Sequence, residues 1–388
     1  MITYLFFTYW KTLHTAFLFD HHGILAGVFP KFINSDYILF CIKALVTIMI
    51  VIVIATYITL YQKRKSFLYK SHINRKLKAL ISTGILDNKE DIISAGKIEN
   101  FKRTLEKRIL SQFTIDELIN IKGSIKGETV KNICWLYEEL GLKNISLKKL
   151  DSNEWFIKAR GIQELYLMEQ HDTLDKIYKS VNDKNDFVRM ESQVGIIHLT
   201  GFEGLLFLNV IEYVLTEWQQ IKLLERLRNF DMDHAFLAEN IPSWLQSNNY
   251  SVIIFALKLA EDYQQYGLNE QIVRCLDNPD ELVRNQAIKC LKSLADEHTP
   301  KKLTEHFASE TYLNQLNILD CLENIATQKE VGFLAGLMEN KSDIIKLKAA
   351  KVLGRCSSEG LNLLAKIGSI QPEPYHRIYL HIKYEISR

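Results

Sequence analysis

At several places in the sequence, acidic and imidazole side chains are adjacent and could supply metal ligands or proton carriers. Three of these places are Asp20-His21-His22, Glu297-His298 and Glu305-His306. A zinc site needs three or four ligands that converge, and Asp20-His21-His22 lacks a third, distant ligand. We therefore interpret the first place as a loop beside a membrane segment and the other two as a solvated helix end and loop.

Other catalytic signatures are missing from the sequence. No G-x-x-x-x-G-K-[ST], G-x-S-x-G or H-E-x-x-H motif occurs, so the usual phosphate-binding, hydrolase and zincin signatures are lacking. Six cysteines form no C-x-x-C pair and fall within apolar helical patterns, which predicts core thiols in a reducing compartment. We expect a protein that is not an enzyme, with no catalytic, cofactor-binding or metal-binding residues.

Basic side chains form two groups that could bind acidic or anionic partners. The members of one group recur at the same position of a repeated pattern: Lys158, Arg189, Arg284 and Lys346. They could contact a partner, or they could form a ladder of ion pairs within the molecule. We prefer the ladder of internal ion pairs. The other group follows an apolar run and includes no acid, so it could contact anionic lipid headgroups: Lys63, Arg64, Lys65, Lys70, Arg75, Lys76 and Lys78.

The apolar run itself predicts a membrane-spanning helix. Residues 44–61 carry no charge, and with residues 37–43 they are long enough to cross a hydrocarbon core of about 30 Å. Because basic residues follow at once, the positive-inside rule puts the C-terminal part in the cytoplasm, and in the cytoplasmic membrane if the protein is bacterial. The aromatic-rich residues 1–36 are either an interfacial or extracytoplasmic helix or a first spanning helix in a hairpin.

Composition favours an all-α fold and no nucleic-acid partner. The 48 basic and 46 acidic residues leave a net charge of +2, without the basic excess of a nucleic-acid-binding domain. Glycine (17) and proline (6) are scarce among 388 residues, and no alternating strand pattern with hairpin turns occurs.

A pattern of about 31 residues repeats through the C-terminal part. Each copy starts with an aliphatic residue, which is often followed by a basic residue. Counted from that aliphatic residue, a small residue stands at +4 and an apolar residue at +8. Good copies start at Ile157, Val188, Val252, Val283 and Ile345, with weaker copies at Ile221 and Leu313. We expect about seven units of helix, turn and helix, stacked into a right-handed α-solenoid.

Helix boundaries within the units can be predicted as well. The residue three before the aliphatic is a good N-cap, as in Asn185, Asn249, Asp280 and Ser342. Gly201 and Gly354 are expected just after second helices. The small residue at +4 would let one helix approach its neighbour closely.

The segment D-E-L-V-R-N-Q-A-I-K-C-L, residues 280–291, and its copies resemble HEAT repeats, especially the short HEAT-like repeats of bilin-lyase-type proteins. The resemblance covers roughly residues 151–370. It implies ladder pairs between an acidic or amide residue and the basic residue of the pattern. The pairs would be Asp280/Arg284, Asn185 or Asp186/Arg189, Asp343/Lys346 and Glu154/Lys158.

Two enzyme classes share such repeats. Di-iron hydroxylases of this type use His-Glu dipeptides, and this chain contains only the reverse order. Bilin lyases would imply a tetrapyrrole, for which we locate no motif.

We predict six segments. They are 1–36, the aromatic-rich membrane segment; 37–61, a transmembrane helix; 62–78, a basic juxtamembrane linker; 79–150, a helical linker and N-terminal cap with helices over 98–113 and 132–142; 151–370, the repeats; and 371–388, a C-terminal cap. The expected function is a membrane-anchored cytoplasmic scaffold that binds a protein partner, itself associated with the membrane. The alternatives are a bilin-lyase-like or metal-dependent enzyme and an anionic-lipid-binding protein.

Overall fold

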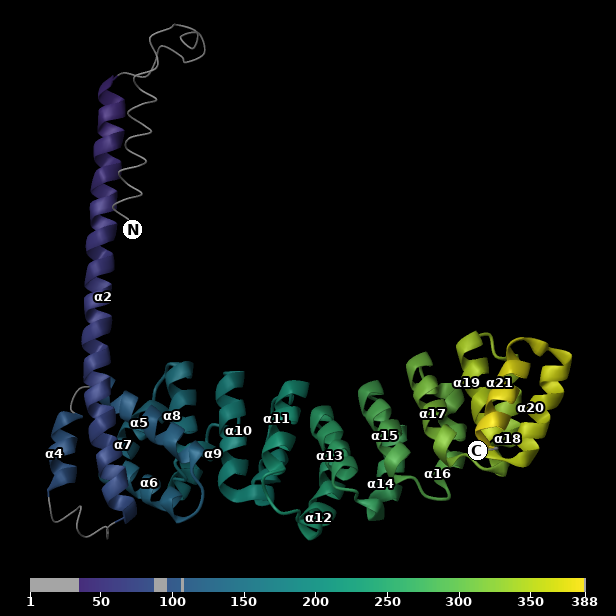
Figure 1. The fold of residues 1–388 in the computed structure, drawn as a ribbon. Helices are drawn as coiled ribbons and strands as arrows, with labels where there is room; N and C mark the ends of the chain where they lie inside the picture. Colours follow the sequence, from purple (N-terminus) through teal and green to yellow (C-terminus); the bar gives the residue numbers. More distant parts are fainter. Residues whose placement is uncertain (1–34, 87–95, 106–107, 387–388) are drawn as a thin grey trace, which may run out of the picture. The chain divides into compact units, whose positions relative to one another are not determined.

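The computed structural model describes residues 35–86, 96–105 and 108–386, and their regular secondary structure is entirely helical, with no strand among them (Figure 1). The prediction of an all-α chain is confirmed for this part of the sequence. The chain divides into two compact units, residues 1–75 and 76–388. Residues 1–34, which include Asp20-His21-His22 and most of the predicted first membrane segment, lie outside the described residues.

Helix α2 runs without a break from Ser35 to Leu86. Among the described helices it alone is long and apolar enough to cross a membrane. The apolar side chains of its first half are exposed; Leu45, Val53 and Leu60, for example, each keep at least 60% of their surface. The basic residues between 63 and 78 continue the same helix, so the sequence that we predicted as a linker is helical.

Four helices cover residues 97–150: α4 (Lys97–Thr104), α5 (Arg108–Ser124), α6 (Glu128–Glu139) and α7 (Leu142–Leu150). The prediction of one helix over 98–113 was wrong, because the chain leaves helix α4 at Thr104. Leu105 is buried, and its carbonyl accepts a hydrogen bond of 2.6 Å from Ser111 Oγ in α5. The apolar spacing of Ile98, Phe101 and Leu105 is helical, but it gave no sign of this turn.

The rest of the chain consists of repeated units, each with a short first helix or turn followed by a longer second helix. The second helices pack mainly on their neighbours in sequence and follow in order in Figure 1. The second helices are α8 (Trp155–Leu167), α10 (Asp186–Thr200), α11 (Glu217–Leu227), α13 (Tyr250–Asp262), α15 (Glu281–Leu294), α17 (Tyr312–Ile325) and α19 (Asp343–Cys356). Shorter first helices lie between most of them: α9 (Leu174–Tyr178), α12 (His234–Trp244), α14 (Asn269–Arg274), α16 (Thr299–His306) and α18 (Val331–Gly336). Before α11, the 3-10 segment η2 (Gly201–Asn209) takes the place of a first helix.

Each second helix except α8 begins with a side-chain N-cap. The predicted N-caps Asn185, Asn249, Asp280 and Ser342 all accept backbone N–H bonds through their side chains, which satisfies donors that a helix start leaves free. We call the residue three after the N-cap the anchor position, because its side chain is buried in all of these helices except α8, where Ile157 is half-buried. The anchor positions are Ile157, Val188, Gln219, Val252, Val283, Asn314 and Ile345.

Two predicted starting residues were wrong. Ile221 and Leu313 are exposed, at 49% and 59%, whereas Gln219 and Asn314 are buried at the anchor positions. We had required an aliphatic residue there, and these two units bury an amide instead. With this correction the anchor positions are 31 residues apart, except for the step of 33 from Gln219 to Val252.

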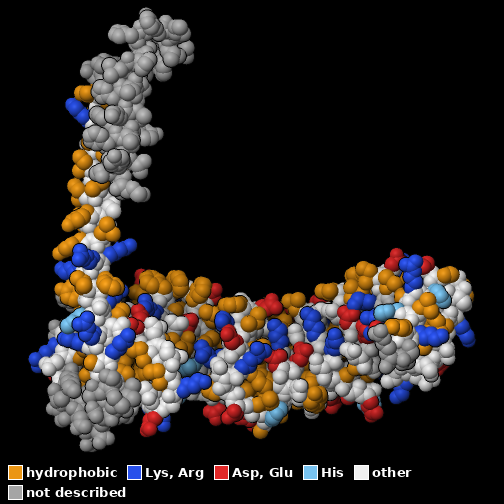
Figure 2. Space-filling view, viewed as in Figure 1, with side chains coloured by type: hydrophobic (Ala, Val, Ile, Leu, Met, Phe, Trp, Pro, Cys, Tyr) orange, Lys and Arg blue, Asp and Glu red, His pale blue; other side chains and the backbone are white. Residues whose placement is uncertain are grey.

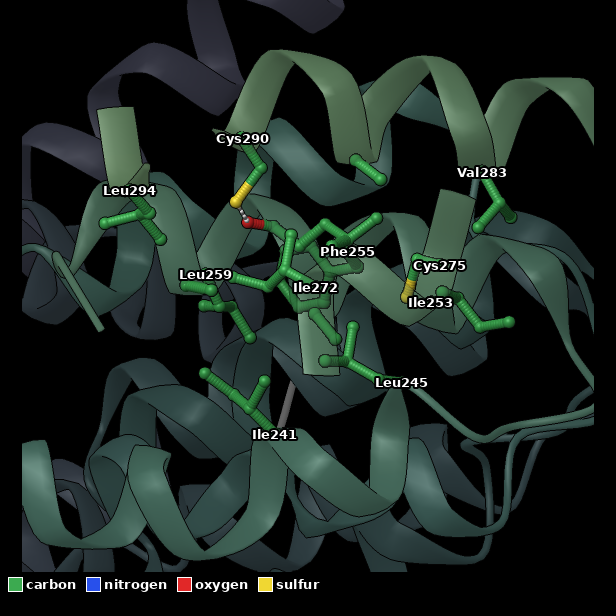
Figure 3. Packing of buried hydrophobic residues seen from close by; sticks show 14 of the residues in the cluster. Ile241, Leu245, Ile253, Phe255, Leu259, Ile272, Cys275, Val283, Cys290 and Leu294 are labelled. Atoms are coloured by element: carbon green, nitrogen blue, oxygen red, sulfur yellow. Dashed lines mark hydrogen bonds between the residues drawn. The ribbon is translucent and has the colours of Figure 1, made fainter. Parts of the chain in front are cut away.

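The apolar core of the repeats is continuous. In Figure 3, side chains from neighbouring helices, such as Phe255, Ile272 and Val283, pack together between the ribbons. Cys290 Sγ donates to the Leu257 carbonyl across 3.3 Å, so this thiol bridges α15 and α13. Ala287, the small residue of its unit, is fully buried, in line with its predicted role at a close helix contact.

Helices α20 (Ser358–Ile370) and α21 (Pro372–Ile386) pack on α19 and on each other at the C-terminal end of the described chain. Gly201 follows α10 with φ +65°, as predicted. Gly354, in contrast, lies inside α19 rather than after it. A Cβ at Gly354 would come within 2.6 Å of Ile382 Cδ1, so this glycine permits close packing of α21 and does not end a helix.

Candidate functional site

Three of the four basic residues of the repeats are bound to the following unit. Lys158 Nζ lies 2.6 Å from Asp183, and Arg284 Nε donates to Glu310 Oε1 across 2.7 Å. Arg189 instead places its guanidinium 4.1 Å from the centroid of the Tyr213 ring, a cation–π contact. These residues are therefore engaged within the molecule, as the ladder interpretation requires.

The partners in this ladder differ from the predicted pairs. Asp280 caps α15 through the Leu282 N–H and Arg284 bonds Glu310, while Lys158 pairs with Asp183 rather than Glu154. Only Lys346 has its predicted partner, Asp343 at 2.6 Å, and that carboxylate is exposed. Lys158 and Arg284 thus pair with a carboxylate of the next unit, while Arg189 and Arg284 also donate to backbone carbonyls directly before their own N-caps.

The second helices also present a row of exposed apolar side chains. One residue before the anchor position, and so about 100° around the helix from it, a large apolar side chain keeps between 51% and 59% of its surface exposed. We call these side chains the apolar row: Phe156, Phe187, Trp218, Leu282, Leu313 and Ile344. At α13 the row is interrupted, because Ser251 stands there and is buried.

Sequence reasoning missed the apolar row although its 31-residue spacing was visible. Leu313 was taken for an anchor residue itself, and Trp218 was assigned to the core or rim of the array. Periodicity alone does not say which of two adjacent apolar residues faces inward. The N-cap settles this, because it fixes the rotation of the first turn.

The apolar row begins at a hollow of about 540 Å³ between α5, α8 and α10. Its aromatic wall is made by three rings: Trp155 stacks on Phe187 with centroids 5.3 Å apart and an interplanar angle of 25°, and Phe156 meets Trp155 edge-on at 5.8 Å. Hydrophobic side chains gather over the upper ends of α8 and α10 in Figure 2. We call this hollow the aromatic pocket.

The floor of the aromatic pocket is a polar network centred on Glu164, which is 2% exposed. Glu164 accepts hydrogen bonds from Ser146 Oγ and Lys149 Nζ at 2.5 Å and from Arg160 Nε at 3.2 Å. Burial lowers the pKa of Lys149, and the adjoining Glu164 acts in the opposite direction. A buried carboxylate with this many donors is held rigidly, so the floor is a fixed structure.

Two further carboxylates line the aromatic pocket, Asp116 and Glu191. Arg160 donates from one terminal nitrogen to both oxygens of Asp116, at 2.8 and 3.0 Å. Glu191 accepts a hydrogen bond of 2.9 Å from the Tyr166 hydroxyl, a neutral donor. Burial raises the pKa of Glu191, while the Tyr166 hydrogen bond and the charge of Arg226 lower it.

The remaining predicted positions lie apart from the aromatic pocket. The side chains of the basic group on α2 are exposed, apart from the half-buried Lys70. Glu297 and His298 are exposed at a helix start, and His306 lies 3.6 Å from Asp277. Within the described residues, no three His, Cys, Asp or Glu side chains are grouped so as to hold a metal ion.

Comparison with known proteins assigns no family to the chain. No protein-family model and no curated protein matches the sequence. Among solved structures, an engineered protein from the Northeast Structural Genomics Consortium is similar at a TM-score of 0.37 and 14% identity, over 77% of this chain and 90% of that chain.

Proposed function

We propose that the protein is a membrane-anchored scaffold whose HEAT-like α-solenoid binds a protein partner in the cytoplasm. In this proposal α2 crosses the membrane with residues 37–61, and the repeat units stack as a right-handed solenoid of helix pairs. The partner is a protein that is itself associated with the membrane. No cofactor and no nucleic acid takes part.

The observation that carries this proposal is the apolar row. Soluble surfaces rarely expose large apolar side chains in a contiguous, regular arrangement unless another molecule covers them. Aromatic residues, here Phe156, Phe187 and Trp218, are enriched in protein interfaces. The regular spacing along the second helices, interrupted at α13, suits an extended polypeptide segment, because solenoids present extended binding surfaces.

In this proposal the membrane anchor holds the binding surface close to partners in the same membrane. Tethering a binding surface to a bilayer raises the local concentration of any partner in the same membrane. Lys158, Arg189 and Arg284 were candidates for partner contacts, but their internal bonds leave the apolar row as the stronger candidate. The exposed basic residues of α2 would orient the anchor and could contact anionic headgroups.

The experiment that tests the proposal is in-cell crosslinking of the full-length tagged chain in its native membranes, followed by mass spectrometry. A chain that lacks residues 1–62 is run in parallel. We expect a discrete protein crosslinked to residues 151–370, with a lower yield when the anchor is removed. A lipid, metal or pigment in the eluate without any protein partner would contradict the scaffold and favour the lipid-binding or enzyme alternatives.

A further inference from the structure

The aromatic pocket differs in its chemistry from the last three members of the apolar row. The later members Leu282, Leu313 and Ile344 are aliphatic, whereas the pocket presents two stacked rings and a third ring edge-on to them. The faces of aromatic rings attract cations, an effect that strengthens when the cation loses water. An aliphatic wall would give the same apolar contact without this attraction.

The charges around the aromatic pocket point the same way. Three carboxylates, Asp116, Glu164 and Glu191, line it. Arg160 and the buried Lys149 both bond Glu164, and Arg160 also bonds Asp116. The charge of Arg226 acts on Glu191, although its guanidinium forms no ion pair with that carboxylate among the described contacts. Glu191 is the remaining carboxylate, and its hydrogen-bond donor is the uncharged Tyr166 hydroxyl.

We propose that the aromatic pocket receives a lysine or arginine side chain of the partner segment that docks along the apolar row. The cationic head would lie against the Trp155 and Phe187 rings and near Glu191, and apolar residues of the same segment would cover Leu282 and Leu313. The partner segment would thus carry a basic residue for the aromatic pocket and apolar residues at a distance from it for the units of α15 and α17. This inference rests on the proposed function and adds the chemical class of the partner's anchoring residue.

The test uses the full-length chain in its native membranes with a photoreactive benzoyl-phenylalanine at Phe156. The same group at Leu313 samples the apolar row away from the pocket, and a third position, the 60% exposed Tyr266, serves as the control. We expect Phe156 and Leu313 to capture the same protein, and the peptide captured at Phe156 to carry Lys or Arg within two residues of the crosslink. Leu313 capture with no basic residue near the Phe156 crosslink, or capture of lipid at Phe156, overturns the pocket assignment but leaves the scaffold intact.

Capture at neither position above the Tyr266 level overturns both proposals, so their failures are distinguishable. Two variants then test the pocket chemistry through the crosslink yield at Leu313. Glu191→Gln removes the charge but keeps an acceptor for Tyr166, and Phe187→Leu installs the residue that α15 and α17 carry at the same position. Both variants therefore keep the fold.

We expect each variant to reduce the yield about fivefold, the size of a partly desolvated cation–π contact for Phe187→Leu and of a partly exposed ion pair for Glu191→Gln. Raising the salt concentration should weaken the wild type more than Glu191→Gln. The matched control Glu203→Gln, at an exposed position outside the pocket, should leave the yield unchanged. Unchanged yields in both pocket variants would contradict a cationic occupant.

Discussion

Arg284 on α15 reaches across to Glu310, just before α17, and its Nε lies 2.7 Å from a carboxylate oxygen whose side chain is 2% exposed. The same guanidinium also donates to the carbonyls of Asn278 and Pro279. Glu310 in turn accepts a hydrogen bond from Asn314 Nδ2, and Asn285 Nδ2 donates to the side-chain oxygen Oδ1 of Asn314. One buried polar network therefore joins two consecutive units at their second helices.

Replacing Arg284 with methionine should destabilise the chain strongly. The variant keeps most of the side-chain volume but leaves Glu310 buried without its cation, which typically costs about 3–5 kcal/mol. Chemical denaturation followed by circular dichroism measures the loss. Lys346→Met, at the same register position, is the matched control, and it should leave stability unchanged because its partner Asp343 is exposed. Equal effects of the two variants would contradict the ladder.

Ala287→Glu should prevent folding of the repeats or lower their melting temperature sharply. Ala287 is fully buried at the helix contact, and a carboxylate there would be desolvated without a partner. Lys289→Glu, two residues on and exposed, controls for the added negative charge. Thermal melting by circular dichroism distinguishes them, and an unchanged melting temperature for Ala287→Glu would refute the register of α15.

The stability of the chain should fall as the pH drops from about 6.5 to 4, in part through His198. Burial, assisted by the charge of Arg226, lowers the pKa of His198 to about 4, whereas an unfolded histidine has a pKa of about 6.5. Between these values the unfolded chain binds a proton that the folded chain does not, so acid favours unfolding, by roughly 1–3 kcal/mol for this group. His198→Gln should flatten the dependence of the denaturation midpoint on pH in this window; an equally steep dependence in the variant would contradict the assignment.

The buried thiols should resist alkylation in the folded chain. Burial raises the pKa of Cys275 to about 11 and that of Cys321 to about 12, and it raises the pKa of Cys290 further. Since the thiolate is the reactive form, a maleimide at pH 8 should label these residues slowly until denaturant is added. A cysteine placed at the exposed Ser293 should react at once. Rapid labelling of Cys290 under native conditions would show that the packing of α13 and α15 is looser than described.

Sequence patterns located the second helices well because caps and periodicity are local signals. Asn185, Asn249, Asp280 and Ser342 cap the predicted helices, and the spacing of 31 placed the strong units. The pattern failed at Gln219 and Asn314, where the core position is polar. Burial of an amide depends on partners in another unit, such as Asn285, and no local pattern encodes that.

The candidate site was harder to predict than the fold. The aromatic pocket combines Asp116 on α5 with Trp155 on α8 and Glu191 on α10, so its geometry depends on how α5 packs beside the first repeat unit. The basic residues were correctly grouped by their position in the repeated pattern. The predicted pairs joined residues three to four apart, whereas the carboxylate partners of Lys158 and Arg284 lie about 25 residues further along the chain.

The contacts that make up the ladder, which we call its rungs, also affect how a chain of similar units assembles. Tandem repeats of matching length can stack in the wrong order during synthesis, since each apolar face fits several others. Here the rungs differ: Lys158 with Asp183, Arg189 with the Tyr213 ring, and Arg284 with Glu310. In a misplaced unit, a buried carboxylate such as Glu310 would lie opposite a neighbour that has no guanidinium to pair with it. These polar contacts between units thus disfavour incorrect pairing of the units. The apolar core, which is common to all units, stabilises the stack.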